Sequence, residues 1–291
     1  MGATNGSGHD PLWTRVAWLL PAALLAVVLA APHTPVHVAW AWVPSLGIEA
    51  SFHFDGLNRL FLLLITGIGT LVFFYAPGYL HGHRDLGRLM ALLTAFMLAM
   101  IGAVSADGML LLFVFWEATS VLSFLLVGFG HDRKESRDSA LQALLVTGAG
   151  GLALLGGILL IQTAAPGLRL SDLPGLAPAL RDDPRFLFGV LLVVVGCMTK
   201  SAQFPFHFCL PGAMAAPTPG SAYLHSATLV KLGVYLLARF DEAMGGVEAW
   251  SSGLVAIGTV TSVWAAVQAL RERDLKRILA WSTVASLGTM T

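Results

Sequence analysis

The sequence predicts an all-α polytopic membrane protein with about nine transmembrane helices. Hydrophobic residues make up 56% of the 291 residues and charged residues only 12%, and the mean hydropathy is +0.75. Soluble globular domains carry about 25% charged residues. The composition therefore excludes an ordinary soluble domain, and a net charge of zero gives no reason to expect nucleic-acid binding.

Apolar runs of about 17 to 25 residues, each long enough to cross a bilayer, follow one another along the chain. They cover residues 13–31, 57–79, 86–104, 109–129, 141–163, 186–205, 221–240 and 250–270. A ninth helix begins near Leu275 and continues to Thr291 without a polar tail or turn signal. We therefore expect the sequence to be part of a longer chain.

Lysine and arginine are distributed unequally between the loops on the two sides. One side has ten: Arg15, Arg84, Arg88, Arg133, Lys134, Arg137, Arg271, Arg273, Lys276 and Arg277. The other has five: Arg59, Arg169, Arg181, Arg185 and Arg239. The positive-inside rule predicts that the first side, and with it the N-terminus, is cytoplasmic. Alternatively, the first span is a signal peptide, because Arg15 precedes an Ala-rich run with small residues at Ala30 and Ala31.

Only three charged residues fall deep inside the predicted spans: Glu117, Lys200 and Lys231. A charge near the bilayer centre costs roughly 2.5 to 3.5 kcal/mol on insertion scales, so it usually faces a partner, a cavity or an ion route. The structural alternatives are a packing partner for Glu117 and snorkelling anchors for the lysines, although both lysines lie far from their helix ends. The sequence favours a buried ion pathway.

The stretch 198–231 joins two of these charges through a proline-rich connection. Pro205 lacks an N–H donor and clashes with the preceding turn, so we expect the helix to kink or end soon after Lys200. His225 and Lys231 lie six residues apart in the next predicted helix, which places them about 120° apart around a regular α-helix. They would line successive positions of a path. The alternative for His225 is a hydrogen bond to a neighbouring carbonyl.

Glycines crowd the predicted helix 141–163. There is no preceding strand and no GxxxxGK pattern, so the sequence favours helix packing over a phosphate site. Ala149, Ala153 and Gly157 recur every four residues, a small-residue stripe that lets another helix approach closely. Cys197 and Cys209 lack metal-ligand spacing and are expected to be unpaired packing residues. We expect neither a metal nor a cofactor.

Three segments resemble the antiporter-like subunits shared by Mrp-type cation/proton antiporters and respiratory complex I: residues 115–120, 199–206 and 222–231. Residues 54–57 and 274–277 resemble flanking signatures of the same family, and the motifs occur in the family's order. Lys231, after His-Ser-Ala-Thr, is more similar to the large A subunit of Mrp antiporters than to the complex I subunit, where a threonine is usual. The resemblance covers residues 51–291.

The resemblance implies a proton or cation route that uses Glu117, Lys200, His225 and Lys231, in which Glu117 and Lys200 form a switchable ion pair. The chain would be a subunit of a multi-subunit Na⁺/H⁺ antiporter in a bacterial-type plasma membrane, and not an enzyme. Its partners would be other membrane subunits of the complex, protons, Na⁺ and the lipid bilayer. The resemblance implies four parts: an N-terminal helix and external loop over 1–56, the family's N-terminal helix over 57–85, the first five-helix repeat over 86–240, and the start of the inverted second repeat over 250–291.

Two other functions stay open. The first is a proton-pumping subunit in the membrane arm of a redox complex such as complex I or a membrane-bound hydrogenase; the second is an inactive structural remnant, because the second repeat is incomplete. Neighbouring genes for small antiporter subunits or for iron–sulfur subunits would separate the first of these from an antiporter. The chain also departs from the family, with one helix instead of two ahead of Asp55, Gly212 in place of an aspartate and Cys209 in place of a tryptophan.

Overall fold

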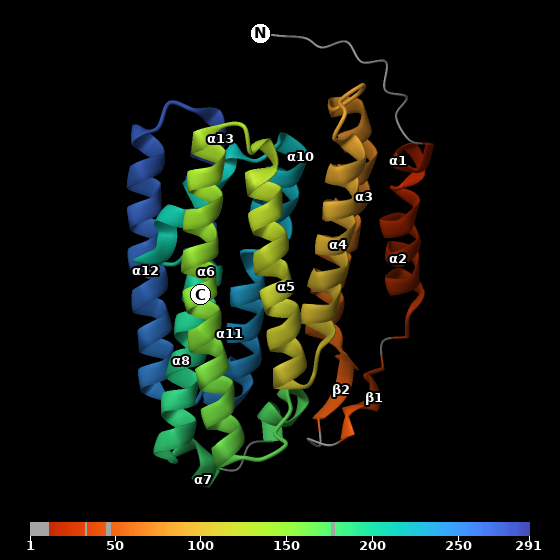
Figure 1. Cartoon of the computed structure of the whole chain (residues 1–291). Helices are drawn as coiled ribbons and strands as arrows, with labels where there is room; N and C mark the ends of the chain where they lie inside the picture. The colour runs from red at the N-terminus through yellow and green to blue at the C-terminus, as the bar shows by residue number, and fades with distance from the viewer. Residues whose placement is uncertain (1–11, 33, 45–47, 176–177) are drawn as a thin grey trace.

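The chain forms a bundle of roughly parallel helices with a two-stranded hairpin at one end (Figure 1). The computed structural model describes residues 12–32, 34–44, 48–175 and 178–291. Six of its helical segments are long and apolar enough to cross a membrane: Trp13–Ala30, Gly56–Tyr79, Leu86–Ser105, Met109–Gly130, Lys134–Ala164 and Glu248–Arg271. The predicted all-α membrane fold is confirmed. The N-terminus, whose side of the membrane the charge asymmetry predicts, lies outside the described residues.

The helices follow one another along the chain with short connections. The first half contains α1 (Leu12–Val16), α2 (Leu19–Ala30), α3 (Gly56–Tyr79), α4 (Leu86–Ser105), α5 (Met109–Val127) and α6 (Lys134–Ala164). The second half contains α7 (Pro178–Arg181), α8 (Pro184–Lys200), α9 (Cys209–Gly212), α10 (Thr218–Ser221), the π-helix η6 (Ala222–Thr228), α11 (Lys231–Met244), α12 (Glu248–Arg271) and α13 (Leu275–Met290). Short 3₁₀ turns lie at Gly128–Gly130, Leu170–Gly175, Phe206–Phe208 and Ala213–Ala215.

Aspartates that accept hydrogen bonds from the first free N–H groups begin three of these helices. Asp55 caps α3 through the N–H of Asn58 at 2.9 Å, and Asp183 caps α8 through the N–H of Arg185 at 2.8 Å. Asp274 caps α13 in the same way, through the N–H of Lys276 at 2.8 Å. These caps fix where the three helices begin.

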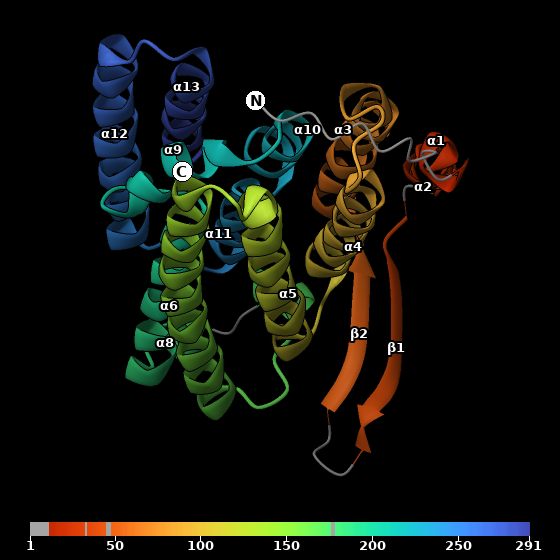
Figure 2. The ribbon, with the colours of Figure 1, turned by 45° about the horizontal axis from the view of Figure 1, so that its top comes forward.

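The bundle places the helices of the predicted pathway at its centre. In Figure 2, α6 and α8 lie side by side, α12 and α13 form one edge, and α1 and α2 lie at the opposite edge against α3. Large apolar side chains such as Leu71, Phe74 and Leu152 stay about 70% exposed on the outer surface, as expected for helices whose outer faces meet lipid.

The connection between the first two spans, predicted to be a loop, contains a β-hairpin. Strand β1 (Val36–Val43) pairs antiparallel with β2 (Ile48–Phe54), with Val36 opposite Phe54. The buried Asp107, between α4 and α5, anchors the hairpin: its N–H donates to Ser51 O at 2.9 Å and its carboxylate lies 3.1 Å from His37 Nε2. The end of the bundle that carries the hairpin and α7 is called the hairpin face below (Figure 1). The opposite end, with the α3–α4, α5–α6 and α12–α13 connections, is called the basic face. These connections contain Arg84, Arg133 and Arg273.

Two predicted helices are interrupted. The helix predicted over 186–205 ends at Lys200, and the helix predicted over 221–240 consists of the end of α10, the π-helix η6 and α11. In η6 the N–H of Leu229 donates to Leu224 O at 2.9 Å, an i→i−5 bond, and Thr228 Oγ1 donates to Tyr223 O at 2.7 Å. Single π-turns of this kind occur often at functional sites.

Candidate functional site

Lys200 is the last residue of α8 and is almost fully buried, with 2% of its surface exposed. Its ammonium donates hydrogen bonds to α5: to Ser120 Oγ at 2.8 Å and to Trp116 O at 3.0 Å. The ammonium also lies 5.0 Å from the centre of the Trp116 ring, within the range of a cation–π interaction. α5 therefore supplies a cradle of two hydrogen-bond acceptors and one aromatic ring for this charge.

Glu117 lies on the same turn of α5 but points elsewhere. Trp116 and Ser120, four residues apart, share one face of the helix, whereas Glu117 is rotated by about 100° from Trp116. Its side chain packs against α6, where a Cβ on Gly151 would lie only 1.9 Å from Glu117 Oε1. This oxygen is buried and has no hydrogen-bond partner among the described residues.

Glu117 on α5 and Lys200 at the end of α8, the two members of the predicted ion pair, thus both approach the same turn of α5 without forming a salt bridge. Lys200 directs its hydrogen bonds to Ser120 and Trp116, while Glu117 Oε1 has no hydrogen-bond partner among the described residues. The predicted pair is not formed in this conformation, because Glu117 faces α6 and Lys200 approaches the next face of α5.

Glycines on α6 make this arrangement possible. A Cβ on Gly150 would lie 1.7 Å from Thr199 Oγ1, the residue before Lys200, and a Cβ on Gly151 would collide with Glu117. The predicted stripe of Ala149, Ala153 and Gly157 is wrong in part: Gly157 is buried against α8, but Ala149 is exposed. Gly150 and Gly151, one and two residues after Ala149, allow the close approach described here.

Pro205 lies in the non-helical segment that follows Lys200. Ala202 has a φ of +51°, and the Phe204–Pro205 bond is cis. The released N–H of Phe204 donates to Thr261 Oγ1 of α12 at 3.0 Å, while Gln203 Oε1 is buried without a partner in the described structure. The irregular backbone is thus held against protein, as membrane depth requires.

His225 lies in η6 and is 5% exposed. Neither Nδ1 nor Nε2 has a hydrogen-bond partner among the described residues. The alternative in which His225 bonds a neighbouring carbonyl is therefore not seen in this conformation. A buried imidazole with two unsatisfied nitrogens is costly in a purely structural role.

His225 and Lys231 line one cavity of about 510 Å³ between η6, α11 and α13. The regular-helix expectation of about 120° between them does not apply, because the π-turn between them changes the rotation per residue. Ser282, Thr283 and Ser286 of α13 add hydroxyls to the wall. We call this the inner cavity. It gives His225 polar neighbours on a different helix.

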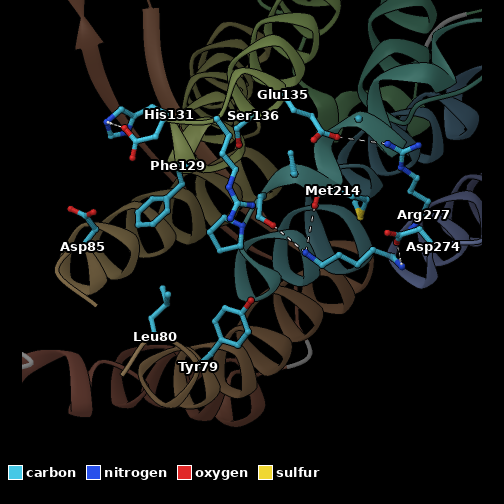
Figure 3. Close-up of a pocket in the computed structure, with 18 of the residues that line it drawn as sticks. Tyr79, Leu80, Asp85, Phe129, His131, Glu135, Ser136, Met214, Asp274 and Arg277 are labelled. Carbon is cyan, nitrogen blue, oxygen red and sulfur yellow. Dashed lines mark hydrogen bonds and ion pairs between the residues drawn. The ribbon is translucent and has the colours of Figure 1, made fainter. Parts of the chain in front are cut away.

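A second cavity, of about 560 Å³, opens at the basic face and is called the surface cavity. Tyr79 and Leu80 lie on one side, Glu135 and Ser136 on another, and Arg277 closes the rim (Figure 3). Met214 and Lys276 line both cavities. The basic face and the inner cavity therefore meet at these two residues.

The sequence reasoning missed three candidate functional groups. Ser120 and the carbonyl of Trp116 lie inside the segment 115–120, and only their position opposite the end of α8 identifies them as the cradle of Lys200. Lys276 lies inside the segment 274–277, and its place between two cavities is set by packing. A serine four residues after a tryptophan in a membrane span is too common a pattern to predict the contact between Ser120 and Lys200.

No group of three or more His, Cys, Asp or Glu side chains in the described ranges is arranged to hold a metal ion. Cys197 and Cys209 are free and buried. At Gly212, which departs from the family's aspartate, a Cβ would meet Gln142 Oε1 at 3.5 Å, an ordinary contact. The site is built from protonatable side chains, hydroxyls and carbonyls.

Comparison with protein families gives two matches. The family described as NADH:quinone oxidoreductase/Mrp antiporter, TM, matches residues 106–291. The family described as NADH-ubiquinone oxidoreductase (complex I), chain 5 N-terminus, matches residues 40–90. The first match contains the residues of the sites described above, except the part of the surface cavity formed by the end of α3 and the connection between α3 and α4.

Curated relatives and solved structures agree with these matches. Na⁺/H⁺ antiporter subunit A1 of Staphylococcus haemolyticus (strain JCSC1435) is 46% identical over 247 residues, which cover 85% of this chain and 31% of the relative. The subunit A1 of Staphylococcus aureus (strain Newman) is 44% identical over the same shares. The chain therefore spans about a third of the length of the curated relatives it matches.

The Mrp complex from Dietzia sp. DQ12-45-1b contains a chain with a TM-score of 0.85 and 39% identity, covering 94% of this chain and 30% of that chain. The membrane-bound sulfane sulfur reductase, an archaeal respiratory membrane complex, has a chain with a TM-score of 0.83 and 23% identity, covering 96% of this chain and 58% of that chain. The second likeness concerns the fold alone.

Proposed function

Because the chain belongs to the NADH:quinone oxidoreductase/Mrp antiporter family, we propose that it acts in the proton-translocating subunit of a multi-subunit Na⁺/H⁺ antiporter. The relatives named as antiporter subunits support the exchange of Na⁺ for H⁺. The likeness to a chain of an Mrp complex supports other membrane subunits as partners. In this proposal the chain is a transporter subunit in the cell membrane and catalyses no covalent reaction.

The observation that carries the proposal is the buried Lys200 ammonium in its cradle of Ser120 and Trp116, one residue from Glu117. A charged side chain in this position is costly unless it has a task. The two acceptors are a hydroxyl and a carbonyl, which hold an ammonium without neutralising it. Lys200 is therefore free to exchange these acceptors for the carboxylate of Glu117 when its surroundings change.

The proposed path runs from the inner cavity towards α5. His225 and Lys231 take up protons from the inner cavity. Lys200 carries the charge between these two residues and Glu117. The break in the helix at Pro205 lets the end of α8 move. Formation and separation of the Glu117–Lys200 pair would then set which groups hold a proton. We propose that residues 86–240 form the first five-helix repeat and that residues 250–291 begin its inverted partner.

Membrane orientation belongs to the same proposal. The basic face is cytoplasmic and the hairpin face is external, according to the distribution of Lys and Arg. The surface cavity would then open to the cytoplasm, and protons would reach the inner cavity from that side.

A second function, a proton-pumping subunit of a redox-driven membrane complex, has one favouring observation. The region 40–90 matches the family described as NADH-ubiquinone oxidoreductase (complex I), chain 5 N-terminus. In that case the energy would come from electron transfer in another subunit.

An energy-source experiment separates the two. The complete complex that contains this chain, purified and reconstituted in liposomes with an internal pH dye, is given a Na⁺ gradient without any electron donor. The proposal expects a Na⁺-driven change of internal pH that is absent with choline in place of Na⁺. Proton movement that requires an electron donor and acceptor, and ignores the Na⁺ gradient, would establish the redox alternative.

A further inference from the structure

The surface cavity and the inner cavity meet at one charged side chain. Lys276, in the first turn of α13, and Met214 line both. The remaining walls differ: the surface cavity has charged rim residues such as Glu135 and Arg277, whereas the inner cavity contains His225 and Lys231. The only charged side chain common to the two sets of described lining residues is therefore Lys276.

The ammonium of Lys276 is held at this junction by backbone carbonyls. It donates to Ala216 O at 3.3 Å and to Met214 O at 3.5 Å, in the connection between α9 and α10; Figure 3 shows the contact at Met214. Both distances exceed the usual 2.7–3.2 Å of N–H···O hydrogen bonds, so the ammonium is held loosely. The backbone from which the side chain extends is held by the helix cap, because the N–H of Lys276 donates to Asp274 Oδ1 at 2.8 Å.

Lys276 also extends onto the face of α13 that lines the inner cavity. Ala280, Thr283 and Leu287 follow it at positions four, seven and eleven residues further along, which lie on one helix face. A small molecule that enters from the basic face by way of the junction therefore passes the ammonium before it reaches Thr283.

We propose that Lys276 is the gate between the two cavities and that it admits protons while excluding metal cations. The inference rests on the proposed function, since it assumes that protons enter the inner cavity from the basic face. Carbonyl oxygens are the ligands that dehydrated alkali cations use in selective pores. The Lys276 ammonium occupies the two carbonyls at the junction and adds a fixed positive charge, so Na⁺ meets both a filled site and electrostatic repulsion.

Protons cross the same point without displacing the lysine. The ammonium gives one N–H proton to water on the inner side and regains one from water on the surface side. No net charge stays behind, and no other reactant is needed. A metal cation has no equivalent route.

Accessibility of the inner cavity tests the gate directly. In the complete complex, with Cys197→Ala and Cys209→Ala to remove the two thiols of this chain, Thr283→Cys is labelled by a cationic, membrane-impermeant methanethiosulfonate applied from the basic face, and labelling of the same complex without Thr283→Cys is subtracted as background. Lys276→Met should raise the labelling rate by about tenfold, a factor that corresponds to roughly 1.4 kcal/mol. The labelling rate with a neutral reagent of similar size should rise less in Lys276→Met, because the ammonium does not repel a neutral reagent.

Two further variants complete the design. Lys276→Arg keeps the charge and should keep the slow rate, whereas Lys134→Met removes a positive charge from the same face at an exposed position outside both cavities and should change nothing. Equal rates in the parent and Lys276→Met with both reagents would overturn the gate. If instead the parent complex shows no Na⁺-driven proton flux, the proposed function fails while the labelling still decides the gate.

Discussion

The carboxylate of Glu117 lies against the bare backbone of Gly151, so that a methyl group at position 151 would come within 1.9 Å of Oε1. α6 thereby fixes the direction of a side chain on α5, and with it the distance between Glu117 and Lys200. Gly148 lies on the same helix, and a Cβ there would meet nothing within 4 Å. A substitution at Gly148 is therefore a matched control for one at Gly151.

Gly151→Ala should reduce Na⁺/H⁺ exchange by about tenfold or more, because the new methyl group displaces the Glu117 carboxylate; mispositioned catalytic groups commonly cost up to 10²-fold. Gly148→Ala should leave exchange unchanged. The assay is Na⁺-dependent pH change in liposomes that hold the complete complex, normalised to the amount of assembled protein. Equal activity of the two variants would mean that the position of Glu117 does not matter.

Ser120→Ala should weaken exchange without abolishing it. The substitution removes the shorter of the two hydrogen bonds of the Lys200 ammonium, and hydrogen bonds to charged groups contribute roughly 1.5 to 3 kcal/mol. Trp116 O remains as an acceptor. Ser123→Ala, one turn further along the same helix and also buried, serves as the control. An unchanged rate in Ser120→Ala, or an equal loss in Ser123→Ala, would argue against the cradle.

Asp55 and Arg239 tie the start of α3 to α11, with Arg239 Nη2 donating to Asp55 Oδ1 at 2.9 Å. Asp55→Asn should lower the free energy of unfolding by roughly 3 kcal/mol, the lower end of the range for breaking a buried ion pair. Glu49→Gln, which breaks the more exposed pair with Arg169, should cost at most about 1 kcal/mol. Thermal unfolding of the detergent-solubilised complex measures both, and similar losses would contradict the assignment.

The same pair predicts a pH dependence. Burial raises the pKa of the Asp55 carboxyl, but the hydrogen bonds from Arg239 and the Asn58 N–H outweigh it, so the pKa lies below 3.8. A lowered pKa stabilises the folded state above the unfolded value, and this contribution is lost as the pH falls through the folded pKa. The stability difference between the parent and Asp55→Asn should therefore be full at neutral pH and shrink below about pH 4. A difference that stays constant down to pH 3 would contradict the lowered pKa.

Hydropathy was sufficient for most of the fold because spanning segments need a minimum apolar length. The bounds of α3, α4 and α12 differ from the predicted spans by at most two residues. The hairpin was missed although residues 36–43 carry a signal, Val and Trp at alternate positions, that fits a strand. The π-turn at η6 has no comparable signal, since it is set by the packing of Tyr223 and Leu224 in the core.

The site could be predicted as a set of residues but not as a geometry. Glu117, Lys200 and Lys231 were identified because a charge in an apolar span is expensive. Their mutual arrangement depends on contacts between helices far apart in sequence. Lys200 and Ser120 are 80 residues apart, and Glu117 is directed by a glycine on a third helix. A composition argument cannot decide whether two buried charges pair or lie on adjacent faces.

Membrane orientation is testable at two exposed residues. Asp132, with 94% of its side chain exposed, lies on the basic face, and Asp182 lies beside α7 on the hairpin face. In intact cells, an impermeant thiol reagent should label Asp182→Cys and spare Asp132→Cys until the cells are opened. The reverse pattern would invert the assignment of both faces.

The central claim is that Glu117 and Lys200 work as one unit in proton transfer, and a double-mutant cycle tests it most directly. Na⁺-driven proton flux is measured in liposomes for the complete complex with Glu117→Ala, Lys200→Ala and both. Each single variant should lose most of the flux while the complex still assembles, and the double variant should be no worse than either, as expected for residues that act together. Near-normal flux in the assembled single variants would contradict the claim, as would losses that multiply in the double variant.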